Sequence, residues 1–139
     1  QAYEKNYSRE CFIMLFGIGT DVVEVSRMRE SHSKYGESLA KKILTPNEMQ
    51  MFNDSKIKEN FLAKRFAAKE AFAKAMGHGL RGEVNLQAIK SDHDDLGKPF
   101  LKFNVELEKK MEKLNIKCSH LSISDEKNIA VAFVILEQG

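Results

Sequence analysis

Asp21 and Glu70 are the two carboxylates whose surroundings most favour metal chemistry in this chain. Residues 15–23 alternate as a strand does, which places Asp21 on the same face as Gly17 and Gly19. Because glycine has no side chain, another group can approach that face closely. Two protein carboxylates, with water and substrate phosphates completing the shell, suit Mg²⁺. The spacing does not show that the two residues meet, and an N-cap for the following helix is the open alternative for Asp21.

Residues 58–76 predict the longest helix, because apolar side chains recur there at helical spacing. Glu70 falls at the edge of the apolar stripe, and Lys74 lies one turn further along the same side. The ordinary interpretation of these two residues is a surface pair that contributes about 0.2–0.5 kcal/mol. Lys69 falls inside the stripe, where its charge must snorkel, pair or bind a ligand, since burying it alone is unfavourable.

A polar strand face is predicted near the C-terminus, where His120, Ser122 and Ser124 alternate with apolar residues. Such a face is usually solvated. The alternative is the wall of a cleft, in which His120 contacts a phosphate and the hydroxyl groups donate hydrogen bonds. The charge of a histidine can be tuned near neutral pH, which suits that second interpretation.

Two glycines follow the long helix. Gly77 is expected to cap the helix in the left-handed conformation. Gly79 either extends the turn or lets the backbone approach a ligand. The segment is not a phosphate loop of the usual kind, because it follows the C-terminus of a helix and does not open an N-terminus.

A basic face is predicted on the helical segment 24–43. Arg27, Lys34 and Lys41 recur every seven residues and therefore share one side of a helix. Arg29 adds charge to the same segment. Further basic residues are Lys42, Lys64 and Arg65. A solvated surface is the ordinary interpretation, and a docking surface for an acidic partner is the alternative, since such charge steers encounter.

The elements that must position these residues follow the order strand, helices, hairpin, helix, hairpin. This order predicts an α+β fold with a mainly antiparallel sheet packed against the long central helix, and not regular βαβ winding. A capping box, Thr45-Pro46-Asn47-Glu48, predicts the start of a short helix. The expected strands are 15–23, 85–91, 100–105, 118–124 and 129–136, and the expected helices are 24–43 with a break near Gly36, 45–53, 58–76 and 106–114.

Length and composition bound the fold and its partners. The 139 residues, 42% hydrophobic and 30% charged, suit one globular domain, which we expect at residues 14–139. Residues 1–13 are aperiodic, and we expect an N-terminal extension or a cloning remnant, with Met14 as the natural start. The net charge of +2 and the lack of a long apolar run predict no nucleic-acid and no membrane partner. Cys11 and Cys118 show no disulfide or metal pattern, which favours a reducing, cytoplasmic location.

Residues 17–25, GIGTDVVEV, and residues 61–77, FLAKRFAAKEAFAKAMG, are long motifs. Residues 96–99, LGKP, and residues 120–124, HLSIS, follow them in order. Together these segments resemble the bacterial holo-acyl-carrier-protein synthases, a family of 4′-phosphopantetheinyl transferases. The resemblance runs from about Met14 to the C-terminus.

This resemblance implies a 4′-phosphopantetheinyl transferase-like fold. It implies transfer of 4′-phosphopantetheine from coenzyme A to a serine of apo acyl carrier protein, with release of adenosine 3′,5′-bisphosphate, in cytoplasmic fatty acid biosynthesis. It also implies Mg²⁺ held by Asp21 and Glu70, and a homotrimer with coenzyme A between neighbouring subunits. The other residues it assigns are Lys74 to a phosphate, Gly77 and Gly79 to a glycine loop, Lys98 and Pro99 to a turn near the nucleotide, and Arg27 to the carrier.

The expected mechanism is in-line attack of the carrier serine on the phosphorus that bears pantetheine. Mg²⁺ would neutralise charge on the diphosphate, and Lys74 would stabilise the leaving phosphate. Lys69, His120 and Ser122 are further candidates for contacts with coenzyme A. The base that takes the serine proton stays open between a metal-bound water and a carboxylate.

Arg27, Arg29 and Lys34 are the candidates for recruiting the acidic carrier. The sequence departs from the family at two positions, where His78 stands in place of a frequent threonine and Asp125 in place of a frequent histidine. Two rival functions share the residue pattern. One is a Mg²⁺-dependent hydrolase of a nucleotide diphosphate, and the other is a non-catalytic module that docks an acidic protein or RNA.

Overall fold

The computed structural model describes residues 14–139, and the predicted N-terminal extension, residues 1–13, lies outside them. The elements in chain order are β1 (Met14–Glu24), α2 (Val25–Tyr35), α3 (Glu37–Ile43), α4 (Pro46–Asp54), α5 (Lys58–Ala75), η1 (Leu86–Ala88), β2 (Ile89–His93), β3 (Pro99–Phe103), α6 (Val105–Lys113), β4 (Ile116–Asp125) and β5 (Ile129–Gln138). Within the described part of the chain, no helix is both long and apolar enough to cross a membrane.

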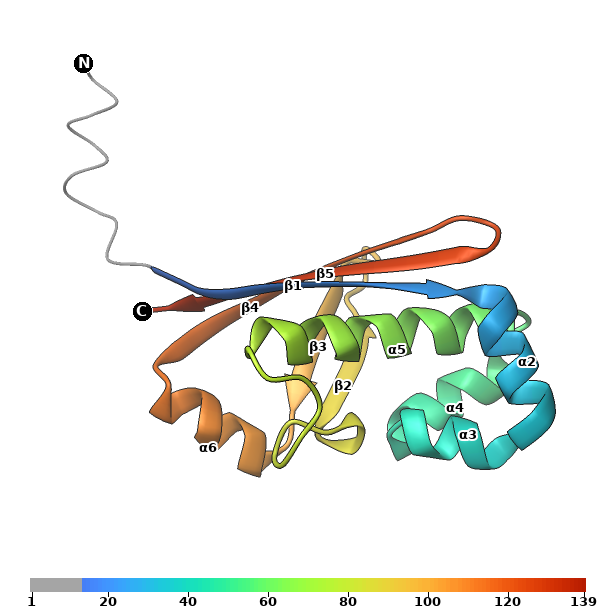
Figure 1. Cartoon of the computed structure of the whole chain (residues 1–139), viewed down its shortest axis with the longest axis horizontal. Helices are drawn as coiled ribbons and strands as arrows, with labels where there is room; N and C mark the ends of the chain where they lie inside the picture. The colour runs from blue at the N-terminus through green and yellow to red at the C-terminus, as the bar shows by residue number, and fades with distance from the viewer. Residues whose placement is uncertain (1–13) are drawn as a thin grey trace, which may run out of the picture.

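The strands form two antiparallel sheets. β1, β5 and β4 lie side by side in that order, so the first strand pairs with the last one. β2 and β3 form a separate hairpin. Figure 1 shows α5 running along the three-stranded sheet, with α2, α3 and α4 at one end of the molecule and α6 at the other. The predicted α+β fold, with a mainly antiparallel sheet against a long central helix, is confirmed.

The two glycines of β1 let α5 lie directly on the strand. A Cβ atom at Gly19 would lie 1.9 Å from the carbonyl oxygen of Ala71, and one at Gly17 would lie 2.0 Å from that of Ala75. Both oxygens belong to the helix backbone, which cannot move aside as a side chain can. The group predicted to approach this face of β1 is therefore the central helix, and Asp21 follows on the same face two residues after Gly19.

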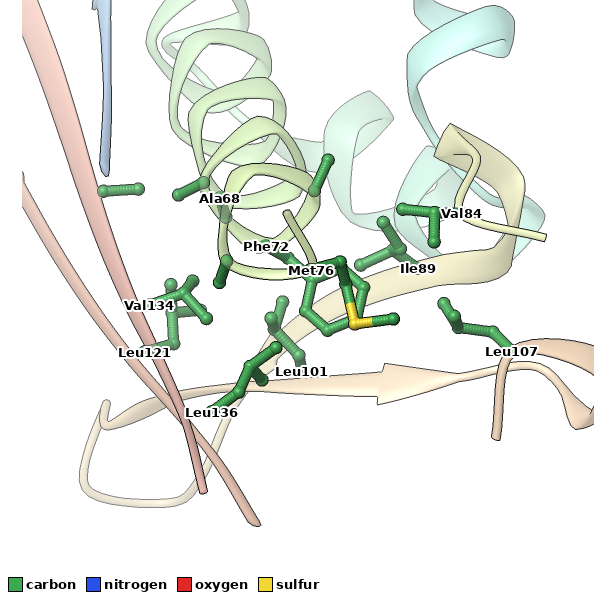
Figure 2. Close-up of a cluster of buried hydrophobic side chains, with 14 of the residues drawn as sticks. Ala68, Phe72, Met76, Val84, Ile89, Leu101, Leu107, Leu121, Val134 and Leu136 are labelled. Carbon is green, nitrogen blue, oxygen red and sulfur yellow. The ribbon is translucent and has the colours of Figure 1, made fainter. Parts of the chain in front are cut away.

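The main core lies where α5 faces both sheets. Figure 2 shows Phe72 of α5 and Met76, the residue that follows the helix, directed into this core. The other buried members labelled there are Ala68 of α5, Val84, Ile89 of β2, Leu101 of β3, Leu107 of α6, Leu121 of β4, and Val134 and Leu136 of β5. Because α5 is surrounded on most sides, its buried surface is wider than the single apolar stripe predicted from its sequence.

A second cluster joins α2, α3 and α4 to the first half of α5 through residues such as Val25, Phe52 and Leu62. The predicted capping box begins α4: Glu48 N donates to Thr45 Oγ1 at 3.4 Å, and Thr45 N donates to Glu48 Oε1 at 2.9 Å. Glu48 is completely buried, although residues at the start of a helix are usually solvated.

Turn residues explain the agreements and the errors in the predicted boundaries. The break near Gly36 is confirmed, and Gly36 has φ 58° between α2 and α3. Gly77 has φ 95°, as expected for a residue that ends a helix in the left-handed conformation. The predicted strand 85–91 begins too early, because Asn85 caps the short helix η1 and β2 begins only at Ile89.

Candidate active site

Asp21 and Glu70 line one cavity of about 310 Å³, which we call the Asp21–Glu70 cavity. β1 supplies Asp21 and α5 supplies Glu70, and the contact of Gly19 with α5 brings these two elements together. Arg27 of α2 lines the same cavity. The convergence of the two carboxylates, which the sequence left open, is therefore present.

Lys74 joins β1 to α5 through two hydrogen bonds. Its Nζ donates to Asp21 Oδ1 and to the carbonyl oxygen of Thr20, each at 3.0 Å. Within residues 14–139, the ion pair of Lys74 is with Asp21 and not with Glu70, so the predicted surface pair of Glu70 and Lys74 is wrong. The N-cap interpretation of Asp21 is also wrong, because Glu24 occupies that position in α2 and makes no capping hydrogen bond.

The electrostatics of the cavity favour a bound cation. Burial raises the pKa of Glu70, and the negative charge of Asp21 raises it further, while Lys74 lowers it. A divalent cation between the carboxylates would relieve this repulsion. No cluster of three or more histidine, cysteine, aspartate or glutamate side chains that could hold a metal occurs within residues 14–139. Two carboxylates that leave room for water and phosphates fit Mg²⁺.

Lys69 lies in the interior, away from this cavity, and its side chain is fully buried. Its Nζ donates to Glu48 Oε1 and the carbonyl oxygen of Ile43, both at 2.7 Å, and to that of Leu86 at 2.9 Å. Burial lowers the pKa of Lys69, and the charge and hydrogen bond of Glu48 oppose this shift. All three donors are used, so the structure favours pairing and corrects the expectation that Lys69 contacts coenzyme A.

A second cavity of about 300 Å³ lies on another side of α5, and we call it the Arg65 cavity. Pro99, predicted near the nucleotide, lines it together with Gly97. The backbone N–H of Lys98 donates to Asp94 Oδ1 at 2.9 Å, which helps to fix that turn. The other lining residues are Phe61, Lys64, Arg65, Ser91, Asp92, His93, Ile123 and Asp125.

Arg65 is the residue that sequence reasoning missed, because it was counted only as basic charge near the surface. Its side chain is 9% exposed, and its guanidinium lies 4.6 Å from the ring centroid of Phe61. Its one protein hydrogen bond within residues 14–139 is a weak one, from Nη2 to Met51 Sδ at 3.9 Å. The position of Arg65 one turn before Lys69 in the central helix was the signal that could have found it.

His120 and Ser122 lie on the outer face of the three-stranded sheet, and neither lines the two cavities described above. Ser122 is opposite Phe133, and Phe133 is opposite Thr20, so the three share one row across the sheet. His120 Nε2 lies 3.1 Å from Glu137 Oε1. Within one chain, the structure therefore does not bring His120 and Ser122 to the two carboxylates.

The glycine loop and the basic helix also lie apart from the carboxylates, except for Arg27. Gly77 and Gly79 have φ angles of 95° and 73° and line neither of the two cavities. Arg29 and Lys34 are exposed on α2, as expected for a solvated or docking surface. Arg27 is also exposed, with its Nε 3.7 Å from Glu24 Oε2.

Comparisons with known proteins agree with this fold. The family model described as the 4′-phosphopantetheinyl transferase superfamily matches residues 17–134. A holo-[acyl-carrier-protein] synthase of Nitrosospira multiformis is 52% identical over 125 residues, covering 90% of this chain and all of the relative. The crystal structure of holo-[acyl-carrier-protein] synthase from Neisseria meningitidis is 46% identical, with a TM-score of 0.86, and covers 88% of this chain and 98% of that one.

A synthase structure from Bacillus anthracis, in complex with CoA (3′,5′-ADP), is 38% identical with a TM-score of 0.75, and covers 91% of this chain and 99% of that one. The fold is thus that of a 4′-phosphopantetheinyl transferase. Within that superfamily, the chain belongs to the holo-[acyl-carrier-protein] synthase family.

Proposed function

We propose that this chain transfers 4′-phosphopantetheine from coenzyme A to a serine of apo acyl carrier protein and releases adenosine 3′,5′-bisphosphate. The observation that supports this most directly is the cavity in which Asp21, Glu70 and Arg27 meet, in a chain whose relatives are synthases of this kind. Cytoplasmic fatty acid synthesis is the setting we propose for the reaction.

Asp21 and Glu70 are the residues that would hold Mg²⁺. The bound ion would supply neutralisation of the charge on the diphosphate. The raised pKa of Glu70 agrees with this assignment, because it reflects first the burial of the carboxyl group and then the negative charge of Asp21. The protein keeps both in place through the rigid contact of β1 with α5.

Lys74 supplies a positive charge at the edge of the same site. Its side chain is 53% exposed, so its ammonium can reach a phosphate oxygen without a change in the fold. A fixed cation near the leaving phosphate stabilises the charge that develops in the transition state. We therefore keep Lys74 as a phosphate contact and place Lys69 outside the reaction.

The Arg65 cavity is our candidate for the nucleoside end of coenzyme A. It shares no lining residue with the Asp21–Glu70 cavity, and it contains Pro99 from the turn predicted near the nucleotide. If the metal site binds the diphosphate of coenzyme A, the 3′-phosphate is the one phosphate of that molecule left for the Arg65 cavity. Arg65 has unused donors for it, and guanidinium groups bind phosphates well.

Copies of this chain are the partners we propose for the outer face of the three-stranded sheet, in a homotrimer. Ile18, Val22 and Phe133 are 59%, 60% and 40% exposed there. Exposed apolar side chains on neighbouring strands of one sheet face favour an interaction surface. Coenzyme A held between neighbouring subunits would connect the Asp21–Glu70 cavity of one copy with the Arg65 cavity of another.

The acidic carrier protein is the partner we propose for α2. Arg27 lies both on the exposed basic surface and at the wall of the Asp21–Glu70 cavity. A carrier attracted by Arg27, Arg29 and Lys34 would therefore present its serine next to the metal site.

One assay separates this function from its rivals. The protein is incubated with coenzyme A, Mg²⁺ and apo carrier protein, and the carrier is then weighed by mass spectrometry. A gain of one phosphopantetheine group supports the transferase. Cleavage of coenzyme A without that gain would support a hydrolase, and no reaction would support a docking module.

A further inference from the structure

Glu48 is a completely buried carboxylate whose two oxygens serve different partners. Oε1 accepts hydrogen bonds from Lys69 Nζ at 2.7 Å and from the backbone N–H of Thr45 at 2.9 Å. Oε2 accepts from the backbone N–H of Ser91 at 3.0 Å and lies 3.5 Å from Arg65 Nη1. The first oxygen is therefore anchored in the interior, and the second lies behind the wall of the Arg65 cavity, which Ser91 and Arg65 both line.

The charges around Glu48 leave Arg65 only partly neutralised. One carboxylate serves two cations, and the ammonium of Lys69 is closer to it than the guanidinium is. Burial lowers the pKa of Arg65, while the negative charges of Glu48 and then Asp92 oppose that shift. Asp92 itself lies 3.8 Å from Lys90 and accepts from the backbone N–H of His93 at 2.9 Å. Within residues 14–139, Glu48 is thus the carboxylate within ion-pair distance of Arg65.

The guanidinium of Arg65 is held in place but weakly hydrogen-bonded. Nη1 is buried beside Glu48 and makes no hydrogen bond within residues 14–139, and Nη2 meets only a sulfur. Stacking on Phe61 and the attraction of Glu48 fix its position. An arginine that is oriented in advance and keeps unused donors is suited to bind an anion at the cavity.

We propose that Glu48 is a positioning residue for the donor substrate: it holds the Arg65 guanidinium at the wall of the Arg65 cavity, so that coenzyme A is preferred over the same molecule without its 3′-phosphate. This inference rests on the proposed function. Glu48 does not touch the substrate, and it acts through Arg65. Lys69 fixes the carboxylate from behind and so contributes to the same arrangement.

The test is a double-mutant cycle with coenzyme A and dephospho-coenzyme A as donors. For each variant, kcat/KM for coenzyme A is divided by kcat/KM for dephospho-coenzyme A. The fraction of folded enzyme cancels in this ratio, so lost stability alone does not change it. Arg65→Met should lower the ratio about tenfold or more, as expected for the loss of a charge-assisted hydrogen bond. Glu48→Gln should lower it about threefold to tenfold, because an amide group then faces the guanidinium.

The decisive result is the double variant. If Glu48 acts through Arg65, Glu48→Gln should have no further effect on the ratio in the Arg65→Met background. An unchanged ratio in Glu48→Gln, or an equal decrease in both backgrounds, would overturn the proposal. Equal use of both donors by the unchanged protein would overturn it too, whereas transfer from neither donor would refute the proposed function itself.

Two further variants complete the design. Glu48→Asp keeps the negative charge but moves it away from Arg65 by one methylene. This variant should fold even if Glu48→Gln does not, and it should lower the ratio by a smaller factor. An unchanged ratio in Glu48→Asp would also count against the proposal. Glu37→Gln is the matched control, because Glu37 begins a helix and pairs with a lysine, at 3.7 Å from Lys41, but is exposed. Its ratio should equal that of the unchanged protein.

Discussion

Gly19→Ala should be the most damaging single methyl addition in β1. The added Cβ would lie 1.9 Å from the carbonyl oxygen of Ala71, so the strand must withdraw by about 1.5 Å to restore an ordinary contact of 3.4 Å. The obstacle is helix backbone and cannot rotate away. We expect a loss of about 3 kcal/mol in the free energy of unfolding, at the upper end of the range for overpacking.

Gly82→Ala is the matched comparison. Gly82 has φ 58°, and an added Cβ there meets no atom within 4 Å. Gly82→Ala should therefore lower the free energy of unfolding only through the unfavourable left-handed backbone conformation, by roughly 1–2 kcal/mol. Backbone conformation alone would rank the two substitutions in the opposite order, because Gly19 is an ordinary strand residue without positive φ.

The assay is urea unfolding followed by circular dichroism, with all variants at one protein concentration because assembly would shift the midpoint. Gly19→Ala should also reduce turnover strongly, since Asp21 moves with the strand and a 1 Å misplacement can reduce a rate about 100-fold. A Gly19→Ala variant that is as stable as Gly82→Ala would refute the direct contact of β1 with α5.

Four more outcomes are expected. Asp21→Asn and Glu70→Gln should each abolish turnover with Mg²⁺ while circular dichroism stays unchanged; near-normal turnover would refute the metal site. In thermal melts without metal, Glu70→Gln should stabilise the protein at neutral pH, because a raised carboxyl pKa means stability lost as pH rises through it. That gain should vanish in melts below the ordinary glutamate pKa, and a gain that persists there would contradict the assigned repulsion. Arg27→Glu should raise KM for the carrier more than KM for coenzyme A, and equal effects would exclude docking. Phe133→Glu should lower the mass measured by light scattering, and an unchanged mass would place the interface elsewhere.

Local sequence patterns predicted most elements of this fold, because their determinants are close together in the chain. The capping box before α4 and the glycines beside α2 and α5 act within a few residues, and each is found where expected. Local patterns do not predict which distant strands pair with each other. The antiparallel pairing of β1 with β5 joins the two ends of the described chain, and only that pairing shows which residues share the outer face.

The predicted role of a single charged residue was right or wrong depending on partners that lie in other elements of the fold. Lys69 was predicted to snorkel, pair or bind a ligand, and the partner that decides among these lies 21 residues away in the sequence. Arg65 was interpreted as surface charge because its carboxylate neighbour, Glu48, belongs to a different helix, α4. The sequence allows the polar face of β4 to be either solvated or the wall of a cleft. The pairing of β4 with β5 shows that it lies on the outer face of the sheet.

The contrast between Glu70 and Glu48 shows how the fold assigns roles to similar side chains. Glu48 is enclosed and meets two cations, so its charge is neutralised by the protein. Glu70 faces a cavity beside another carboxylate, so part of its charge stays unneutralised. A cation from solution is attracted to negative charge that the protein leaves partly unneutralised at an open surface. For this reason we propose metal binding at Asp21 and Glu70, and an organising role for Glu48.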